Sequence, residues 1–123
     1  MRYITDRKRA VGKGAAGSGT AHHWYMQVSA AGLAFIVPTF IYIFGKALGS
    51  DYATVLETFS HPIPAIVTGL MIIFGLHHFN RGFETLMQDY ARGHTLKISI
   101  ILMTVFTYGL MATGLFSLAK LAL

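Results

Sequence analysis

Ionisable side chains gather in one short stretch of this sequence, at the end of a segment that is otherwise apolar. The run His77-His78-Phe79-Asn80-Arg81-Gly82-Phe83, followed by Asp89-Tyr90, brings together two imidazoles, a guanidinium and a carboxylate. Such groups are costly to place at membrane depth, so they indicate a functional site by default. Imidazole can bind a metal, and a tyrosine hydroxyl beside a carboxylate can donate a hydrogen bond or pass a proton. The other elements are expected to hold this stretch at one face of a bilayer.

The composition indicates a membrane protein with a single domain. The chain has 123 residues, of which 54% are hydrophobic and 12% charged, whereas about a quarter of a soluble domain is charged. It contains no cysteine, which excludes disulfides, thiolate zinc sites and iron–sulfur ligation by this chain. Six histidines are then the only strong metal ligands. A net charge of +5 would suggest nucleic acid in a soluble protein. In a membrane protein the distribution of that charge matters more, and no nucleic-acid partner is expected.

Three apolar stretches predict an all-α membrane fold with helices at about residues 24–44, 62–87 and 97–119. Each stretch is close to the ~20 residues that a bilayer core requires. The chain is therefore divided into a basic, glycine-rich tail over residues 1–23 and a three-helix anchor domain over residues 24–123. A loop over roughly 88–95 is predicted to carry Asp89 and Tyr90.

The first span has the features of a membrane boundary. Trp24 and Tyr25 stand where an interfacial aromatic belt would place them. Gln27 and Ser29 are polar and fall in the first turns, close to the basic tail. Pro38 predicts a kink, which transmembrane helices tolerate when neighbours satisfy the freed carbonyl.

The distribution of positive charge predicts the orientation of the three helices. Eight of the ten Lys and Arg residues lie in the tail or between Arg81 and Lys97, and only Lys46 and Lys120 lie at the other side. By the positive-inside rule the amino terminus is cytoplasmic and the carboxyl terminus periplasmic. Three spans bury little surface in one another, so we also expect packing against other subunits of a membrane complex.

His78 is the candidate metal ligand. In a regular helix it shares a face with Gly75 at i−3 and Gly82 at i+4, and the missing side chains leave a flat recess beside the imidazole. A haem macrocycle could lie in this recess with its iron on His78. Alternatively, the glycines serve helix packing and the imidazole hydrogen-bonds a neighbouring carbonyl. His77 points about 100° away, so it cannot serve the same site from a regular helix.

The polar residues beyond His78 also have two interpretations each. Arg81 could pair with a haem propionate, or it could reach the headgroups as an ordinary interfacial arginine. Tyr90 lies ~18 Å beyond His78 along a continuous helix. Its hydroxyl could donate to a carbonyl of a lipid-soluble quinone, with Asp89 orienting it or passing a proton. The alternative is an interfacial tyrosine beside a solvated carboxylate.

At this point the sequence resembles a known family. His78, Gly82, Asp89 and Tyr90 have the H-x-x-x-G-x-x-x-x-x-x-D-Y spacing of the hydrophobic membrane anchor of succinate dehydrogenase (complex II), the family of small cytochrome b subunits. The run from Arg9 to Gly14 and the His22-His23-Trp24 sequence before the first span also look similar. The resemblance extends over nearly the whole chain.

The resemblance implies a cofactor set and a set of partners. His78 would be one axial ligand of a b-type haem shared with a second hydrophobic anchor subunit. Tyr90 would hydrogen-bond ubiquinone with Asp89 beside it, and Gln27, Ser29 and Arg81 are further candidates for cofactor binding. The tail and second loop would dock an iron–sulfur subunit, which receives electrons from a flavoprotein subunit that oxidises succinate. The chain would have no catalytic activity alone. An obvious transit peptide is absent, which favours a bacterial inner membrane as its location.

One position departs from the family pattern. The family has a Q-R-x-T-A run at the start of the first helix, whereas this chain has Met26-Gln27-Val28-Ser29-Ala30. Gln27 therefore replaces the arginine and carries no charge. Arg81, His22, His23 or a partner subunit is expected to take over its part.

The sequence is also compatible with two other functions. A fumarate reductase anchor would support the reverse reaction, and the sequence does not separate the two directions. A cofactor-free structural or assembly subunit, or a small transporter, belongs to a different class. The sequence has no inverted repeat of the kind found in transporters, which argues against the last of these.

Overall fold

The computed structural model describes residues 4–12, 14 and 19–123, and every regular element in these ranges is helical. The elements are α1 (Asp6–Val11), α2 (Gly19–Ala47), α3 (Tyr52–Ser60), α4 (Pro62–Leu70), the π-helix η1 (Met71–Gly75), α5 (Leu76–Tyr90) and α6 (Gly93–Ala122).

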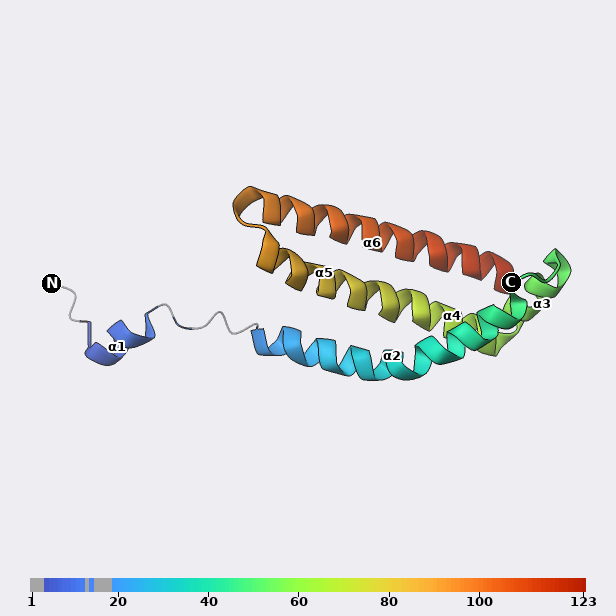
Figure 1. Cartoon of the computed structure of the whole chain (residues 1–123), viewed down its shortest axis with the longest axis horizontal. Coiled ribbons are helices and arrows are strands. Elements are labelled where there is room, and N and C mark those ends of the chain that lie inside the picture. The colour runs from blue at the N-terminus through green and yellow to red at the C-terminus, as the bar shows by residue number, and fades with distance from the viewer. Residues whose placement is uncertain (1–3, 13, 15–18) are drawn as a thin grey trace.

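Three helical rods are long and apolar enough to cross a membrane, which confirms the predicted three-span fold. They are α2, the continuous α4–η1–α5 unit and α6, with mean hydropathies of 1.9, 1.6 and 1.8 over their most apolar windows. They lie side by side (Figure 1), and α2, which contains Pro38, bends along its length. Each rod is longer than the apolar stretch that predicted it, because the helix continues into polar flanking residues.

The second span ends differently from the expectation that residues 88–95 form a loop. Asp89 and Tyr90 belong to the last turn of α5, and the chain leaves the helix only at Ala91, which is extended with φ −123° and ψ 154°. Gly93 then takes a φ of +61° at the start of α6. A positive φ of this kind is readily adopted only by glycine, so the sharp connection is made there.

Several polar side chains are buried inside this bundle, while many large apolar side chains lie on its outside. The most buried polar residues are Ser29, Asn80 and Thr107, which are 4%, 8% and 1% exposed. Large apolar side chains point outward instead, with Phe35 79% exposed and Val105 67% exposed. This pattern suits a chain whose outer surface meets lipid or other apolar helices, because no water competes for the polar groups inside.

Positively charged side chains stand at both ends of the bundle. The start of α2 and the connection between α5 and α6 lie at one end, and α3 and the carboxyl terminus lie at the other (Figure 1). Arg92 and Lys97 belong to the first end, while Lys46 ends α2 at the second and Lys120 lies in the last turn of α6.

Helix α3 closes the second end of the bundle. Asp51 is its N-cap, and its carboxylate accepts a hydrogen bond from the N–H of Thr54 at 3.3 Å. Hydrogen bonding from the side chain and backbone of Thr54 lowers the pKa of Asp51 below its ordinary value. The buried ring of Phe59 holds α3 against the rest of the chain.

A π-helical turn interrupts the second span just before the two histidines. Met71–Gly75 form this turn between α4 and α5, where the sequence predicts a regular helix. Single π-helical turns inside α-helices are rare and occur frequently at functional sites. The turn sets the rotation of α5, and hence the directions of His77 and His78, relative to α4.

Candidate cofactor site

His78 is held by a residue of the first span. Its Nδ1 lies 2.8 Å from Oγ of Ser29, which joins α5 to α2. Ser29 Oγ also donates its proton to the carbonyl oxygen of Met26 at 3.2 Å. A hydroxyl has only one proton to donate, so when that proton goes to Met26 the oxygen accepts from Nδ1–H of His78. In that arrangement Nδ1 carries the ring proton, and Nε2 is left with a lone pair.

The surface beside His78 is bounded by two methionine side chains. A Cβ built on Gly82 would lie 3.9 Å from Cε of Met26, and one built on Gly75 would lie 3.4 Å from Cε of Met71. A methionine side chain therefore lies over each glycine, Met26 from α2 on the Gly82 side and Met71 on the Gly75 side. Both neighbours are the ends of unbranched, flexible side chains that can repack at low cost.

A cavity of about 660 Å³ opens next to this pair. It is lined by Ala21, His22, Tyr25, Arg81, Glu84, Thr85 and Gln88, which come from α2 and α5. Tyr25 precedes Ser29 by four residues and Arg81 follows His78 by three. The cavity therefore lies about one helical turn from the Ser29–His78 contact, toward the start of α2.

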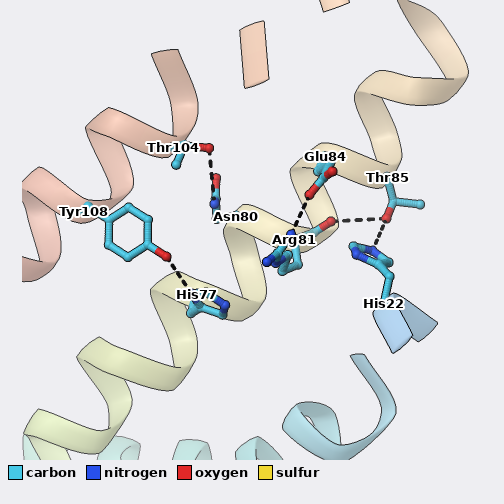
Figure 2. Close-up of polar contacts among 8 residues, drawn as sticks. All are labelled: His22, His77, Asn80, Arg81, Glu84, Thr85, Thr104 and Tyr108. Carbon is cyan, nitrogen blue, oxygen red and sulfur yellow. Dashed lines mark hydrogen bonds and ion pairs between the residues drawn. The ribbon is translucent and has the colours of Figure 1, made fainter. Parts of the chain in front are cut away.

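The charged and polar groups of the cavity are paired with one another. Arg81 Nη1 lies 3.1 Å from Oε2 of Glu84, and their side chains are 43% and 27% exposed. The Thr85 hydroxyl lies 3.1 Å from the carbonyl oxygen of Arg81 and 3.0 Å from Nε2 of His22. Figure 2 shows this chain of contacts from α2 to α5.

Of the residues expected to replace the arginine that is missing at Gln27, two line the cavity and one does not. Arg81 and His22 line the same cavity. Gln27 and His23 are exposed and are not part of its lining. The positive charge nearest to His78 on its own helix is thus Arg81, one turn away.

His77 faces a different part of the bundle, as its position in a helix predicts. Its ring packs edge-on against Tyr25, with centroids 5.1 Å apart, and its Nδ1 lies 3.4 Å from the hydroxyl of Tyr108 on α6 (Figure 2). Next to it, the Asn80 amide donates to Oγ1 of Thr104 at 3.5 Å. These contacts tie α5 to both neighbouring spans. Sequence reasoning missed Tyr108 and Thr104, although both are polar residues inside a predicted span.

Tyr90 and Asp89 stand apart from the cavity. Tyr90 is 82% exposed and Asp89 is also exposed, both in the last turn of α5. Helix α5 runs unbroken from Leu76, so Tyr90 lies ~18 Å along the axis from His78. The structure therefore brings Ser29, His78 and the Arg81 cavity together and leaves Tyr90 on the surface at the same end of the bundle.

The donor set fits one axial ligand of a haem better than a metal site built by this chain alone. In the described residues no three His, Asp or Glu side chains cluster as metal ligands. An axial position needs a single imidazole, and Nε2 of His78, which has no hydrogen-bond partner among the described residues, could supply it. The flexible ends of Met26 and Met71 border the surface where a macrocycle would lie.

The fold and site define a small three-span membrane subunit that presents one fixed imidazole. A family model described as "Succinate dehydrogenase/Fumarate reductase transmembrane subunit" matches residues 1–116. The chain is 40% identical to a succinate dehydrogenase hydrophobic membrane anchor subunit of Paracoccus denitrificans over 123 residues, covering 100% of this chain and 95% of that protein. The chain therefore belongs to the succinate dehydrogenase/fumarate reductase transmembrane subunit family. No solved structure matches it significantly.

Proposed function

We propose that this chain is the hydrophobic membrane anchor of a succinate:ubiquinone oxidoreductase, and that it ligates a b-type haem through His78. Family membership supports the anchor role. The observation that carries the haem assignment is the contact between Ser29 and His78, which leaves Nε2 as the free nitrogen of a fixed imidazole. A second anchor subunit would supply the other axial histidine.

The residues around His78 would hold the cofactor without forming a complete site. Gly82 keeps the surface beside the imidazole free of a side chain, and Met26 and Met71 border it. Arg81, one turn away, can pair with a propionate if Glu84 yields its contact. A haem, when bound, would take up and release one electron at its iron.

The quinone would meet this chain at the end of α5. The Tyr90 hydroxyl can donate to a quinone carbonyl, and the adjacent Asp89 carboxylate can orient it or accept a proton. Because Tyr90 is 82% exposed, the other walls of the quinone site would come from neighbouring subunits. Gln27, exposed in the early turns of α2, stands at the same end of the bundle and can donate an amide proton there.

The distribution of charge supports a cytoplasmic amino terminus and a periplasmic carboxyl terminus in a bacterial inner membrane. The basic α1, with Arg7, Lys8 and Arg9, together with Arg92 and Lys97 would then face the cytoplasm. An iron–sulfur subunit would dock on this face and connect to the flavoprotein subunit. The exposed apolar sides of the helices would be covered by the second anchor and by lipid.

Purification through a tag on this chain tests the anchor role. We expect a flavoprotein, an iron–sulfur protein and a second small membrane subunit in the purified complex, together with succinate-dependent quinone reduction. A colourless preparation without a flavoprotein would contradict the proposal and favour a cofactor-free structural subunit.

A fumarate reductase anchor is the second candidate, because the matching family model covers transmembrane subunits of both enzymes. The direction of the reaction depends on the potential of the quinone. Comparing succinate oxidation with fumarate reduction in the same purified complex, with the quinone of the native membrane, separates the two.

A further inference from the structure

Ser29 is a buried hydroxyl inside an apolar span, and it lies within hydrogen-bonding distance of two partners. It is 4% exposed, and its oxygen lies 3.2 Å from the Met26 carbonyl oxygen and 2.8 Å from Nδ1 of His78. A side chain this deeply enclosed between α2 and α5 has no free donor left for a ligand. The contact spans 49 positions of sequence and therefore depends on how the two helices pack.

We propose that Ser29 is a positioning residue that fixes the tautomer and the ring orientation of His78, so that Nε2 is the nitrogen presented to a metal. The inference rests on the proposed haem ligation for the identity of that metal. It replaces direct cofactor contact, the role first considered for Ser29, with an action through the imidazole.

The physical effect of this contact has two parts. A neutral histidine without a fixed partner populates two tautomers, with the proton on Nδ1 or on Nε2. Only the tautomer with a free Nε2 could bind a metal from this position. A hydroxyl that accepts from Nδ1–H removes the alternative form and raises the electron-donating power of the ring. A neutral hydroxyl can orient the imidazole without placing a charge in the apolar span. A carboxylate in the same role would add a negative charge there.

The first test compares variants of Ser29 in native membranes that contain the full complex. Ser29→Ala removes the acceptor, Ser29→Thr retains a hydroxyl, and Ser117→Ala is a matched control because Ser117 is exposed on α6 and bonds only the Thr113 carbonyl. The readouts are haem content, the low-temperature electron paramagnetic resonance spectrum of the ferric haem, and its midpoint potential.

We expect Ser29→Ala to weaken haem retention by roughly 10- to 100-fold, the range found when a partner of a ligating histidine is removed. The remaining haem should show shifted g values and a raised midpoint potential, because a less electron-donating ligand favours ferrous iron. Ser29→Thr should restore both properties, and Ser117→Ala should leave them unchanged. If Ser29→Ala does not assemble, Ser29→Cys, which retains a weak acceptor of similar size, should give intermediate shifts.

The proposal on Ser29 can fail separately from the proposed function. Loss of the haem in His78→Ala combined with an unchanged spectrum and potential in Ser29→Ala or Ser29→Cys would overturn it. Nitrogen-15 spectra of histidine-labelled complex give a readout that does not depend on haem. They should show His78 protonated at Nδ1 in the original chain and a mixture of tautomers in Ser29→Ala. An identical signal in both would also overturn the proposal, whether or not His78 ligates the haem.

Discussion

His77 and His78 are adjacent in the chain, yet their side-chain hydrogen bonds reach different transmembrane helices. His78 bonds Ser29 of α2 at 2.8 Å, whereas His77 reaches Tyr108 of α6 at 3.4 Å. The first contact leaves a free Nε2 beside Gly82, and the second connects two spans. One histidine is therefore suited to ligand chemistry and its neighbour to holding the bundle together.

Replacing His77 by Phe should lower the stability of the bundle only slightly. Interhelical hydrogen bonds in membranes average about 0.6 kcal/mol, and the 3.4 Å separation from Tyr108 places this one among the weaker contacts. Thermal denaturation in detergent of His77→Phe, Tyr108→Phe and the double variant measures the coupling between them. A coupling energy of several kcal/mol between the two positions would contradict the weak hydrogen bond that the structure shows.

A bulky side chain at Gly82 should displace the haem. A Cβ there would stand 3.9 Å from Met26, so Gly82→Ala fits, while Gly82→Leu would fill the surface beside His78 and push Met26 away. We expect most of the haem signal to be lost in Gly82→Leu and kept in Gly82→Ala. Gly109→Leu is the control, because a Cβ at Gly109 has nothing within 4 Å. Equal haem content in all three variants would place the macrocycle elsewhere.

Replacing Tyr90 by Phe should slow quinone reduction and spare the soluble reaction. The substitution removes one hydroxyl from a residue that is 82% exposed, so the fold should not change. Succinate oxidation with an artificial electron acceptor is expected to persist at its original rate. Parallel loss of both activities would indicate a defect of assembly and not of the quinone site.

The cap of α3 gives a pH dependence with a defined sign. Because hydrogen bonds from Thr54 lower the pKa of Asp51 in the folded chain, the charged carboxylate stabilises the fold above the ordinary carboxyl pKa. This contribution should be lost as the pH falls through the lowered pKa. Thermal unfolding as a function of pH, compared with Asp51→Asn, measures it, since the amide keeps the acceptor without titrating. Identical pH profiles for the two proteins would show that ionisation of Asp51 does not contribute to stability.

The sequence predicts the three spans well, because each needs only a long apolar run. It also predicts that His77 and His78 diverge, since adjacent residues of a helix always do. The partners of each histidine could not be predicted. Ser29 meets His78 across 49 positions, and that pairing depends on the rotation of α2 against α5, which the π-helical turn at Met71–Gly75 helps to set. No local sequence signal predicts the rotation of α2 against α5 or the π-helical turn.

The end of the second span shows a further limit of the pattern. Polarity predicts a loop from about residue 88, yet α5 continues to Tyr90 because no glycine or proline stands between Gly82 and Gly93. The expected roles of Asp89 and Tyr90 depend on quinone and on partner subunits, so they stay predictions.

The most direct test of haem ligation by His78 is a reduced-minus-oxidised absorption spectrum of the purified complex carrying His78→Ala, measured beside His77→Ala. The two variants remove the same group from adjacent positions, so they share any general effect of losing an imidazole from this helix. The proposed ligation predicts that the b-haem signal disappears or falls strongly in His78→Ala and persists in His77→Ala. An unchanged signal in His78→Ala would contradict it.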